Sequence, residues 1–326
     1  MRESFLNKSK RLTEFSSLAT QKEKKKARLV LLSFFGASLA LIGLAIFYRE
    51  LPRFWQKVSG STTVVSQQFP AAPTVTPTPA LEKERKMVEE MVKPLRGTYG
   101  IYFQDLQSKA ILGLSAQEKM TAASLIKLPT ILTLYREAEA GRINLDTIYR
   151  LQEADRQGGA GSLQSKPVGY EISYRKLAEL MGKQSDNTAQ HIIAKILGEE
   201  KIQATVDGLG MKNTSFAENL TTPQDMGIFW ERLYRGRVVS DKSRDEILGF
   251  LTNTIWEERI PAGVPKGIRV AHKIGTETGV ISDAGIVFSQ KPFILVIMTQ
   301  NANEIEAKKA LPEIAKKIYE LHTAER

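Results

Sequence analysis

The sequence of 326 residues contains no cysteine, and its three histidines are widely separated. Without cysteine the chain can form no disulfide, no thiolate nucleophile, no cysteine-ligated zinc site and no lipid-bearing cysteine. His191, His272 and His322 do not have metal-ligand spacing such as His-Glu-x-x-His, so neither a metal nor another cofactor is predicted. A Gly-x-Ser-x-Gly elbow is also missing, which argues against a Ser-His-Asp triad.

The net positive charge is small outside the start of the chain. Residues 1–28 hold nine basic and three acidic residues, which accounts for +6 of the net charge of +10. A nucleic-acid-binding domain gathers its positive charge on the folded face that meets the phosphates. The rest of the chain is near neutral, so nucleic acid is not a predicted partner.

One long apolar run is present, residues 29–48 (LVLLSFFGASLALIGLAIFY), and it contains no charged residue. At about 1.5 Å per residue such a helix spans about 30 Å, the thickness of the hydrocarbon core of a bilayer. The run is longer than the apolar core of a signal peptide, and the charged segment Arg49-Glu50-Leu51-Pro52-Arg53 follows it. The sequence therefore favours an uncleaved transmembrane helix, with a cleaved signal peptide as the open alternative.

The segments on either side of this run set the expected domain organisation. Residues 1–28 should stay in the cytoplasm, because cytoplasmic flanks of membrane spans are enriched in lysine and arginine. Residues 49–80, which become rich in Ser, Thr, Pro and Ala, have too little apolar surface to pack and are predicted to form a linker. The expected protein is single-pass in the cell membrane, with a folded domain over residues 81–326 on the extracytoplasmic side.

Strand-like segments lie at both ends of the folded region, and helix-like segments lie between them. The predicted strands are 98–105, 110–114, 268–274, 282–288 and 293–300. Helices are predicted over 82–92, from Ser124 to about Gly141, after Ser173, over 187–197, after Thr222 and over 304–321 with a kink at Pro312. This order predicts an α+β fold, in which an antiparallel β-sheet is flanked by helices and joined by an all-helical lobe.

The first candidate motif is Ser124-Leu125-Ile126-Lys127. Residues three apart share a face of a helix, so Lys127 would lie beside the hydroxyl of Ser124 and take its proton. A lysine can do this only as a neutral amine, which apolar neighbours or a nearby cation such as Lys273 would favour. Taken alone, a serine and a lysine at this spacing are more often a solvated helix face, and that alternative stays open.

The second candidate motif is Ser185-Asp186-Asn187. In the catalytic interpretation Ser185 carries a proton to the leaving nitrogen, Asn187 holds a substrate amide and Asp186 braces the loop. The plain alternative is a helix cap, since short polar residues satisfy the free N–H groups of a first helical turn.

The third candidate motif is Lys273-Ile274-Gly275-Thr276, at the end of a predicted strand. Lys273 would point into a cleft, and Gly275 would let substrate approach the backbone. The N–H groups of Thr276 and Ser124 would form an oxyanion hole. An exposed lysine before a turn glycine is the alternative for the motif taken alone.

These three motifs, in this order, resemble those of class A β-lactamases and penicillin-binding proteins. Further segments resemble class A enzymes: Gly158-Gly159-Ala160-Gly161-Ser162-Leu163, Leu177-Ala178-Glu179-Leu180-Met181, Thr188-Ala189 and Thr221-Thr222-Pro223. The resemblance covers roughly residues 81–326. It implies the fold of that family, with Ser124 as the acylated nucleophile, Lys127 as its base or relay, and Lys273 as an attractor of the substrate carboxylate.

The sequence departs from the family at two places. Class A enzymes carry a long loop whose Glu-x-x-Leu-Asn glutamate activates water to free the acyl-enzyme, and most of that loop is missing from residues 214–223 (TSFAENLTTP). Glu218 is either the deacylation residue or an exposed loop glutamate. Ile274 replaces a Thr or Ser whose hydroxyl helps to bind the carboxylate, so Thr276 or Thr278 would have to substitute for it, or the substrate differs.

Three functions are predicted from this resemblance, in order of preference. The first is a membrane-anchored serine hydrolase of β-lactamase type. The second is a D-alanyl-D-alanine peptidase that acts on peptidoglycan stem peptides, and the third is a slowly deacylating β-lactam-binding domain. All three acylate Ser124, and they differ in the substrate and in the fate of the acyl group.

Overall fold

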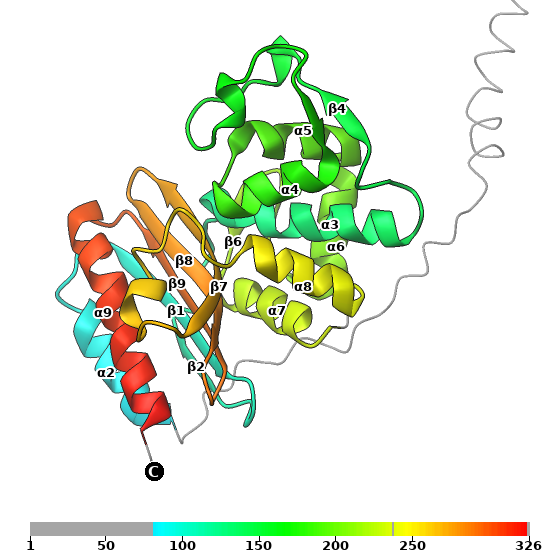
Figure 1. Cartoon of the computed structure of the whole chain (residues 1–326). Coiled ribbons are helices and arrows are strands. Elements are labelled where there is room, and N and C mark those ends of the chain that lie inside the picture. Colours follow the sequence, from blue (N-terminus) through cyan, green and yellow to red (C-terminus); the bar gives the residue numbers. More distant parts are fainter. Residues whose placement is uncertain (1–80, 237, 325–326) are drawn as a thin grey trace, which may run out of the picture. The chain divides into compact units, whose positions relative to one another are not determined.

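The structure is a computed structural model that describes residues 81–324 except residue 237. The predicted cytoplasmic segment 1–28, membrane span 29–48 and linker 49–80 lie outside the described residues. Within the described part, no helix is both long and apolar enough to cross a bilayer. The described residues fold into a five-stranded sheet with helices on both faces, which confirms the predicted α+β class (Figure 1).

All five strands of the main sheet are antiparallel, in the order β2-β1-β9-β8-β7. The strands are β1 (Thr98–Asp105), β2 (Ile111–Leu114), β7 (Arg269–Glu277), β8 (Val280–Phe288) and β9 (Phe293–Gln300). They match the predicted segments, except that β7 continues to Glu277 instead of ending at Ile274. Pairing of β1 with β9 joins the two ends of the folded region, and β7 is left as an edge strand.

Side chains of each strand alternate between two hydrophobic cores, as the pleat requires. On β9, Phe293, Leu295 and Ile297 belong to the core shared with α2 (Glu82–Val92) and α9 (Glu304–Thr323). The residues between them belong to the second core, which continues into the helical lobe. The sheet is therefore buried on both faces, by α2 and α9 on one side and by the helical lobe on the other.

The helical lobe confirms the predicted all-helical part of the fold. It consists of the 3₁₀-helix η2 (Ala123–Ile126) and the helices α3 (Lys127–Glu139), α4 (Tyr174–Lys183), α5 (Asn187–Leu197), α6 (Glu199–Leu209), α7 (Pro223–Tyr234) and α8 (Asp241–Phe250). The predicted caps are in place, since Ser173 accepts a hydrogen bond from the N–H of Lys176 and Thr222 from that of Asp225. Contacts of α7 with β1, β8 and β9 pack the lobe onto the sheet.

Short elements complete the fold and support the loops near the motifs. They are β3 (Met120–Thr121) paired with β6 (Leu220–Thr221), β4 (Ile148–Arg150) paired with β5 (Glu171–Ser173), and the 3₁₀-helices η3 (Glu153–Asp155), η4 (Leu163–Ser165) and η5 (Pro261–Gly263). The β3–β6 pair and a hydrogen bond from the N–H of Ala122 to the carbonyl of Asn219 join the turn 215–220 to the segment before Ser124.

Three local features differ from the sequence-based expectation. The α-helix predicted to begin near Ser124 is preceded by the tighter 3₁₀ turn of η2, so α3 begins at Lys127. α6 and α8 were not predicted, although Gly198 and Ser240 serve as their N-caps. The last helix ends at Thr323 instead of Leu321, and the kink at Pro312 stays a prediction.

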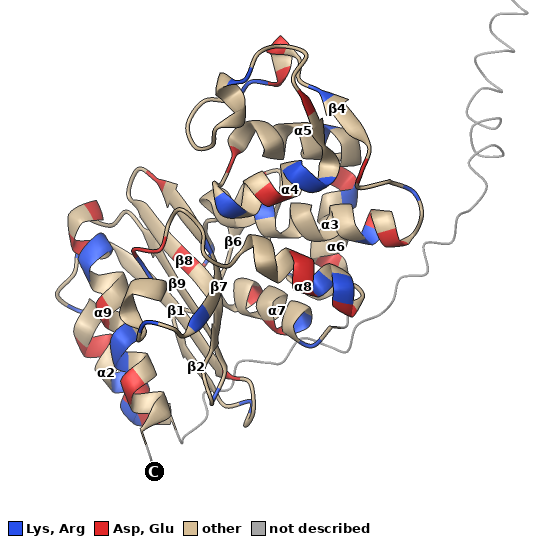
Figure 2. Cartoon of the chain, viewed as in Figure 1, with Lys and Arg blue, Asp and Glu red and all other residues tan. Residues whose placement is uncertain are grey.

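Charged side chains of both signs are interspersed over the described domain. Figure 2 shows blue and red segments alternating along α2, α9, α4 and α8. Many of these charges are paired within one helix, as in the pairs of Arg85 with Glu82 and of Lys176 with Glu179. In the part of the chain that the structure describes, no group of three or more His, Asp or Glu side chains is placed to hold a metal ion.

Candidate active site

The structure brings Ser124 and Lys127 together at the start of the buried helix α3. Lys127 is 4% exposed, and its Nζ donates hydrogen bonds to Ser124 Oγ at 2.7 Å and to Asn187 Oδ1 at 2.8 Å. Desolvation by burial lowers the pKa of Lys127 to about 8, against the opposing charges of Asp186 and Glu277. A large fraction of this amine is therefore neutral near pH 8 and can accept a proton.

The backbone beside two of the motif serines adopts a conformation that side chains rarely take. Ala123, directly before Ser124, has φ +46°, and Ser185 has φ +57°. The left-handed region costs a non-glycine residue roughly 1–2 kcal/mol, so the surrounding packing must hold these residues in place. Backbone strain of this kind clusters at functional sites, where it fixes the direction of a side chain.

Asp186 braces the second motif as predicted. Its Oδ1 accepts a hydrogen bond from the N–H of Ala189 at 2.9 Å and caps α5. Its Oδ2 accepts another from the N–H of Leu163 at 2.8 Å, which ties the motif to the loop before α4. The buried carboxylate of Asp186 therefore caps the helix and braces the loop at the same time.

Asn187 uses both ends of its amide within the protein. Its Oδ1 accepts from Lys127, and its Nδ2 donates to the carbonyl of Gly158 at 2.8 Å. Asn187 thus orients the amine of Lys127, and a substrate amide would have to share these groups. The predicted contact of Asn187 with substrate stays a prediction.

Lys273 reaches from β7 to the second motif. Its Nζ donates to Ser185 Oγ at 2.8 Å and to the carbonyl of Ile274 at 3.0 Å. Lys273 is 2% exposed, and burial together with the charge of Lys127 lowers its pKa well below the usual value. The three motifs, far apart in the sequence, therefore meet as two lysine–serine pairs beside each other.

The free edge of β7 directs a backbone donor toward the site. The N–H of His272 points away from β8, because it donates to the carbonyl of Leu251 at 2.8 Å. Alternate N–H groups of a strand point the same way, so the N–H of Thr276 also faces the open edge. Ser124 lies in the first turn of η2, where N–H groups have no partner within the helix. These two groups are the predicted oxyanion donors.

Gly275 is required by a close approach between β7 and the segment before Ser124. A Cβ at position 275 would lie 2.9 Å from the carbonyl oxygen of Ala122 and 3.4 Å from Ala123 Cβ. The prediction assigned this close approach to substrate. In the described structure, it is the backbone before the nucleophile that approaches Gly275.

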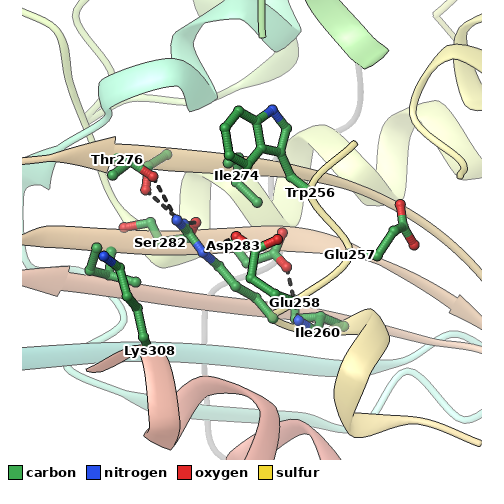
Figure 3. Close-up of polar contacts among 12 residues, drawn as sticks. Trp256, Glu257, Glu258, Ile260, Ile274, Thr276, Ser282, Asp283 and Lys308 are labelled. Carbon is green, nitrogen blue, oxygen red and sulfur yellow. Dashed lines mark hydrogen bonds and ion pairs between the residues drawn. The ribbon is translucent and has the colours of Figure 1, made fainter. Parts of the chain in front are cut away.

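A cavity of about 440 Å³ opens beside these pairs. It is lined by Ser124, Gly159, Ala160, Ser185, Trp256, Glu258, Arg259, Ile274, Thr276 and Lys308. Figure 3 shows that Trp256 and Glu258 come from a loop beside β7, and that Lys308 comes from the first turns of α9. This loop and Lys308 were not among the predicted site residues, because the loop carries no motif and Lys308 lies on the predicted helix 304–321, which carries none either.

Arg259 is the most tightly held of these additional residues. It is 3% exposed, and its guanidinium donates to the carbonyls of Gly275 and Ser282 at 2.9 and 2.6 Å and to Thr276 Oγ1 at 2.6 Å. Ile274, which lines the cavity, brings no hydroxyl. Arg259 and the hydroxyl of Thr276 therefore provide polar groups beside the position where the family usually has Thr or Ser.

Glu218 lies apart from the paired lysines and serines. It is exposed in the turn 215–220 and does not line the cavity. The carboxylates whose charge raises the pKa of Lys127 are Asp186 and Glu277, and Glu277 accepts a hydrogen bond from Asn219 Nδ2 at 3.2 Å. The predicted deacylation role of Glu218 stays a prediction.

Known proteins resemble this chain over the whole described domain. The family model for the β-lactamase enzyme family matches residues 81–321. Beta-lactamase 3 of Bacillus cereus is 23% identical over 241 residues, which cover 68% of this chain and 75% of that protein. The structure of PBP-A is 26% identical, has a TM-score of 0.71, and covers 77% of this chain and 99% of its own. A PBP-A mutant solved as an acyl-enzyme complex with penicillin G is 25% identical, has a TM-score of 0.71, and covers 78% and 99%.

The family model spans far more than half of the chain and includes all three motifs. The fold of the described residues matches that of the solved relatives at a level at which the topology is the same. The chain therefore belongs to the β-lactamase enzyme family and is a serine hydrolase of the β-lactamase type.

Proposed function

We propose that this protein opens β-lactam amides through an acyl-enzyme on Ser124. The observation that carries the proposal is the 2.7 Å contact between Lys127 Nζ and Ser124 Oγ, with the pKa of Lys127 lowered to about 8. A neutral amine at this distance can accept the hydroxyl proton while Oγ attacks the amide carbonyl. Burial of Lys127 thus supports the same conclusion as its geometry.

The remaining steps use the other residues of the site. Attack makes an oxyanion, which the N–H groups of Ser124 and Thr276 are placed to stabilise. Collapse of this intermediate breaks the C–N bond, and Ser185 gives its proton to the leaving nitrogen, with its alkoxide stabilised by Lys273. The proton that Lys127 took from Ser124 replaces the one that Ser185 gave, so the acyl-enzyme forms without net uptake or release of protons.

The charge of the cavity supports a substrate that carries a carboxylate. Arg259 and Lys308 line it together with one carboxylate, Glu258, and the buried Nζ of Lys273 lies behind Ser185. A guanidinium binds a carboxylate through paired hydrogen bonds and tolerates burial better than an ammonium does. We therefore assign to Arg259, with Thr276, the carboxylate recognition that Ile274 cannot provide.

A second candidate function follows from the position of Glu218. Because Glu218 is exposed and outside the cavity, the glutamate of the class A deacylation loop has no counterpart from the turn 215–220 in the cavity wall. Slow deacylation fits a penicillin-binding peptidase better than a fast β-lactamase, and PBP-A, a structural relative, has been captured in mutant form as an acyl-enzyme with penicillin G. The open edge of β7 could also pair with an extended peptide.

One set of measurements separates these functions. Mass spectrometry after exposure to penicillin G should show a covalent adduct that is absent in Ser124→Ala. Rapid loss of the adduct with turnover of a chromogenic cephalosporin supports the β-lactamase. A lasting adduct with release of D-alanine from a stem-peptide mimic supports the peptidase, and a lasting adduct without release supports a binding domain. An intact protein that forms no adduct at all would contradict the proposal.

We also propose that residues 29–48 anchor the protein and place the hydrolase domain outside the cytoplasm. The motivation is the uninterrupted apolar run after a lysine-rich segment. When the full chain is expressed in a bacterium, the protein should remain in carbonate-washed membranes. Protease added outside intact spheroplasts should cut the domain. Release into the soluble fraction with a new N-terminus beyond residue 48 would indicate a cleaved signal peptide instead.

A further inference from the structure

His272 occupies a buried position that the proposed acylation steps do not use. It lies on β7 next to Lys273, but its side chain faces the opposite side of the strand. It is 0% exposed, and its two ring nitrogens meet two carboxylates. Nδ1 lies 2.9 Å from Asp283 Oδ1, and Nε2 lies 3.3 Å from Glu257 Oε1.

These two contacts determine which form of the ring fits. A neutral imidazole has one N–H and can donate to only one of the two carboxylates, whereas an imidazolium donates to both. Burial lowers the pKa of His272, but the charge of Asp283 and the hydrogen bonds to Asp283 and Glu257 outweigh it and raise the pKa to about 9. The bridge is therefore complete at neutral pH.

The surroundings of the ring leave these carboxylates as its main charged neighbours. Asp283 comes from β8, and Glu257 comes from the loop 254–260, which also brings Thr254 Oγ1 to 3.4 Å from Nε2. The guanidinium of Arg259 donates its hydrogen bonds to backbone carbonyls and to Thr276, not to Asp283 or Glu257.

The loop 254–260 is attached at two points, one at Glu257 and one at Ile260. Glu257 is held by His272, and three residues later the N–H of Ile260 donates to Asp283 Oδ2 at 3.0 Å. Figure 3 shows Glu257, Glu258 and Ile260 on a loop that crosses the strands that carry Thr276 and Asp283. The segment between the two attachments carries Arg259, and Trp256 directly precedes it.

We propose that His272, as an imidazolium, is a positioning residue that ties Glu257 to Asp283 and thereby fixes Arg259 and Trp256 in the wall of the cavity. It acts through these residues and does not touch the reacting atoms. The effect on substrate binding rests on the proposed function, whereas the protonation state of the ring does not. Loss of the proton should loosen the loop and weaken substrate binding without changing the proton transfer from Ser124.

The first test reads the ring directly and needs no substrate. The chain has only three histidines, so ¹⁵N-histidine labelling gives three imidazoles to follow by NMR. The signals of His272, identified as those that move in Glu257→Gln, should show both nitrogens protonated at pH 7 and should titrate near pH 9. A ring that is neutral at pH 7 would overturn the proposal, whatever the protein does with β-lactams.

The second test separates binding from chemistry with Glu257→Gln. The introduced amide must keep its oxygen toward the N–H of Thr254, which donates to Glu257 Oε1 at 2.6 Å, so it cannot donate to a neutral ring. The charge-assisted hydrogen bond is then missing at every pH, and the substrate concentration that gives half-maximal acylation should already be raised at pH 8. For penicillin G, the concentration that gives half-maximal acylation should rise about tenfold between pH 8 and 10 in the natural protein, as expected for loss of one charge-assisted hydrogen bond. The rise should be absent in Glu257→Gln.

A control variant and the maximal rate complete the test. Glu179→Gln removes an exposed carboxylate of α4 that pairs with Lys176, and it should follow the natural protein at every pH. The maximal acylation rate should have the same pH dependence in all three proteins, because Lys127 governs it. An equal rise in half-maximal concentration in Glu257→Gln would overturn the proposal. A failure to acylate at all would instead count against the proposed function and leave the NMR result valid.

Discussion

The amide oxygen of Asn187 accepts a hydrogen bond from Lys127 Nζ at 2.8 Å, close to the 2.7 Å that separates the same nitrogen from Ser124 Oγ. Asn187 thus directs the amine toward the nucleophile with a neutral group. A neutral acceptor orients Lys127 without adding the negative charge that would stabilise its ammonium form. Burial lowers the pKa of Lys127, and an amide at position 187 leaves that effect in place.

Replacing this amide by a carboxylate should make Lys127 a worse base at neutral pH. In Asn187→Asp, the new negative charge should raise the pKa of Lys127 from about 8 by about one unit or more. The acylating form is the neutral amine, so the acid limb of the acylation rate should move to higher pH by the same amount. Stopped-flow acylation between pH 6 and 10 measures this limb. The control Asn301→Asp, at an exposed turn, should leave it in place, and an unmoved limb in Asn187→Asp would refute the assignment.

Removal of the amine itself should slow acylation while keeping the fold. Lys127→Met replaces a buried lysine by an unbranched apolar side chain of similar length, so packing around α3 should be retained. Loss of a general base typically lowers the rate by about 10²- to 10⁴-fold. The rate of adduct formation by mass spectrometry, with the melting temperature as a check on folding, gives the answer. A folded variant that acylates at the natural rate would mean that another group accepts the proton of Ser124.

A methyl group at position 275 should disturb the contact between β7 and η2. In Gly275→Ala the new Cβ would lie 2.9 Å from the carbonyl of Ala122, so the two backbones must move apart at a cost of about 1–3 kcal/mol. Calorimetry should show a lower melting temperature, and acylation should slow because Ser124 follows this segment. Gly249→Ala in α8 is a matched control, since no atom lies within 4 Å of its added Cβ and alanine favours a helix by about 0.5–1 kcal/mol. Equal stability of the two variants would contradict the close approach.

The guanidinium of Arg259 should be needed for binding of a carboxylate-bearing β-lactam. Arg259→Lys keeps the charge but cannot reach two carbonyls and Thr276 Oγ1 at once, because lysine lacks the planar fork. The half-maximal substrate concentration should rise at least about tenfold, as for loss of a hydrogen bond to a charged group, with a smaller change in the maximal rate. Arg269→Lys is the control, since Arg269 is exposed and stacks on Phe288. A rise of the same size in the control would argue against a specific role for Arg259.

Substitution of Glu218 should have little effect on the lifetime of the acyl-enzyme. The side chain is exposed and outside the cavity, so Glu218→Gln should change the rate of adduct loss by less than about twofold, far below the effect of removing a general base. The decay of the penicillin G adduct is followed by mass spectrometry, with Glu153→Gln, another exposed glutamate, as control. A much longer lifetime in Glu218→Gln alone would restore Glu218 as the residue that activates water.

The sequence by itself determined the strands of the main sheet, several of the helices and the contact of Ser124 with Lys127. Runs of apolar, β-branched and aromatic residues set the strands, and the caps at Ser173 and Thr222 set helix starts through interactions within one turn. Ser124 and Lys127 lie one turn apart, so their contact is also local. The resemblance to a family whose motifs occur in the same order placed Ser185 and Lys273, 88 residues apart, in one predicted site, but their direct hydrogen bond was not predicted.

Only the tertiary structure decided the rest of the cavity wall and the state of its charges. Arg259 and Glu257 lie in a loop without periodicity or motif, and their partners are set by how that loop packs on β7 and β8. The pKa values of Lys127 and His272 depend on burial and on carboxylates that arrive from other elements. The same holds for Gly275. A glycine in the sequence predicts that another group can approach the backbone closely, but it does not say that this group is the backbone before Ser124. Contacts between distant segments are fixed by packing, and packing is a property of the folded chain.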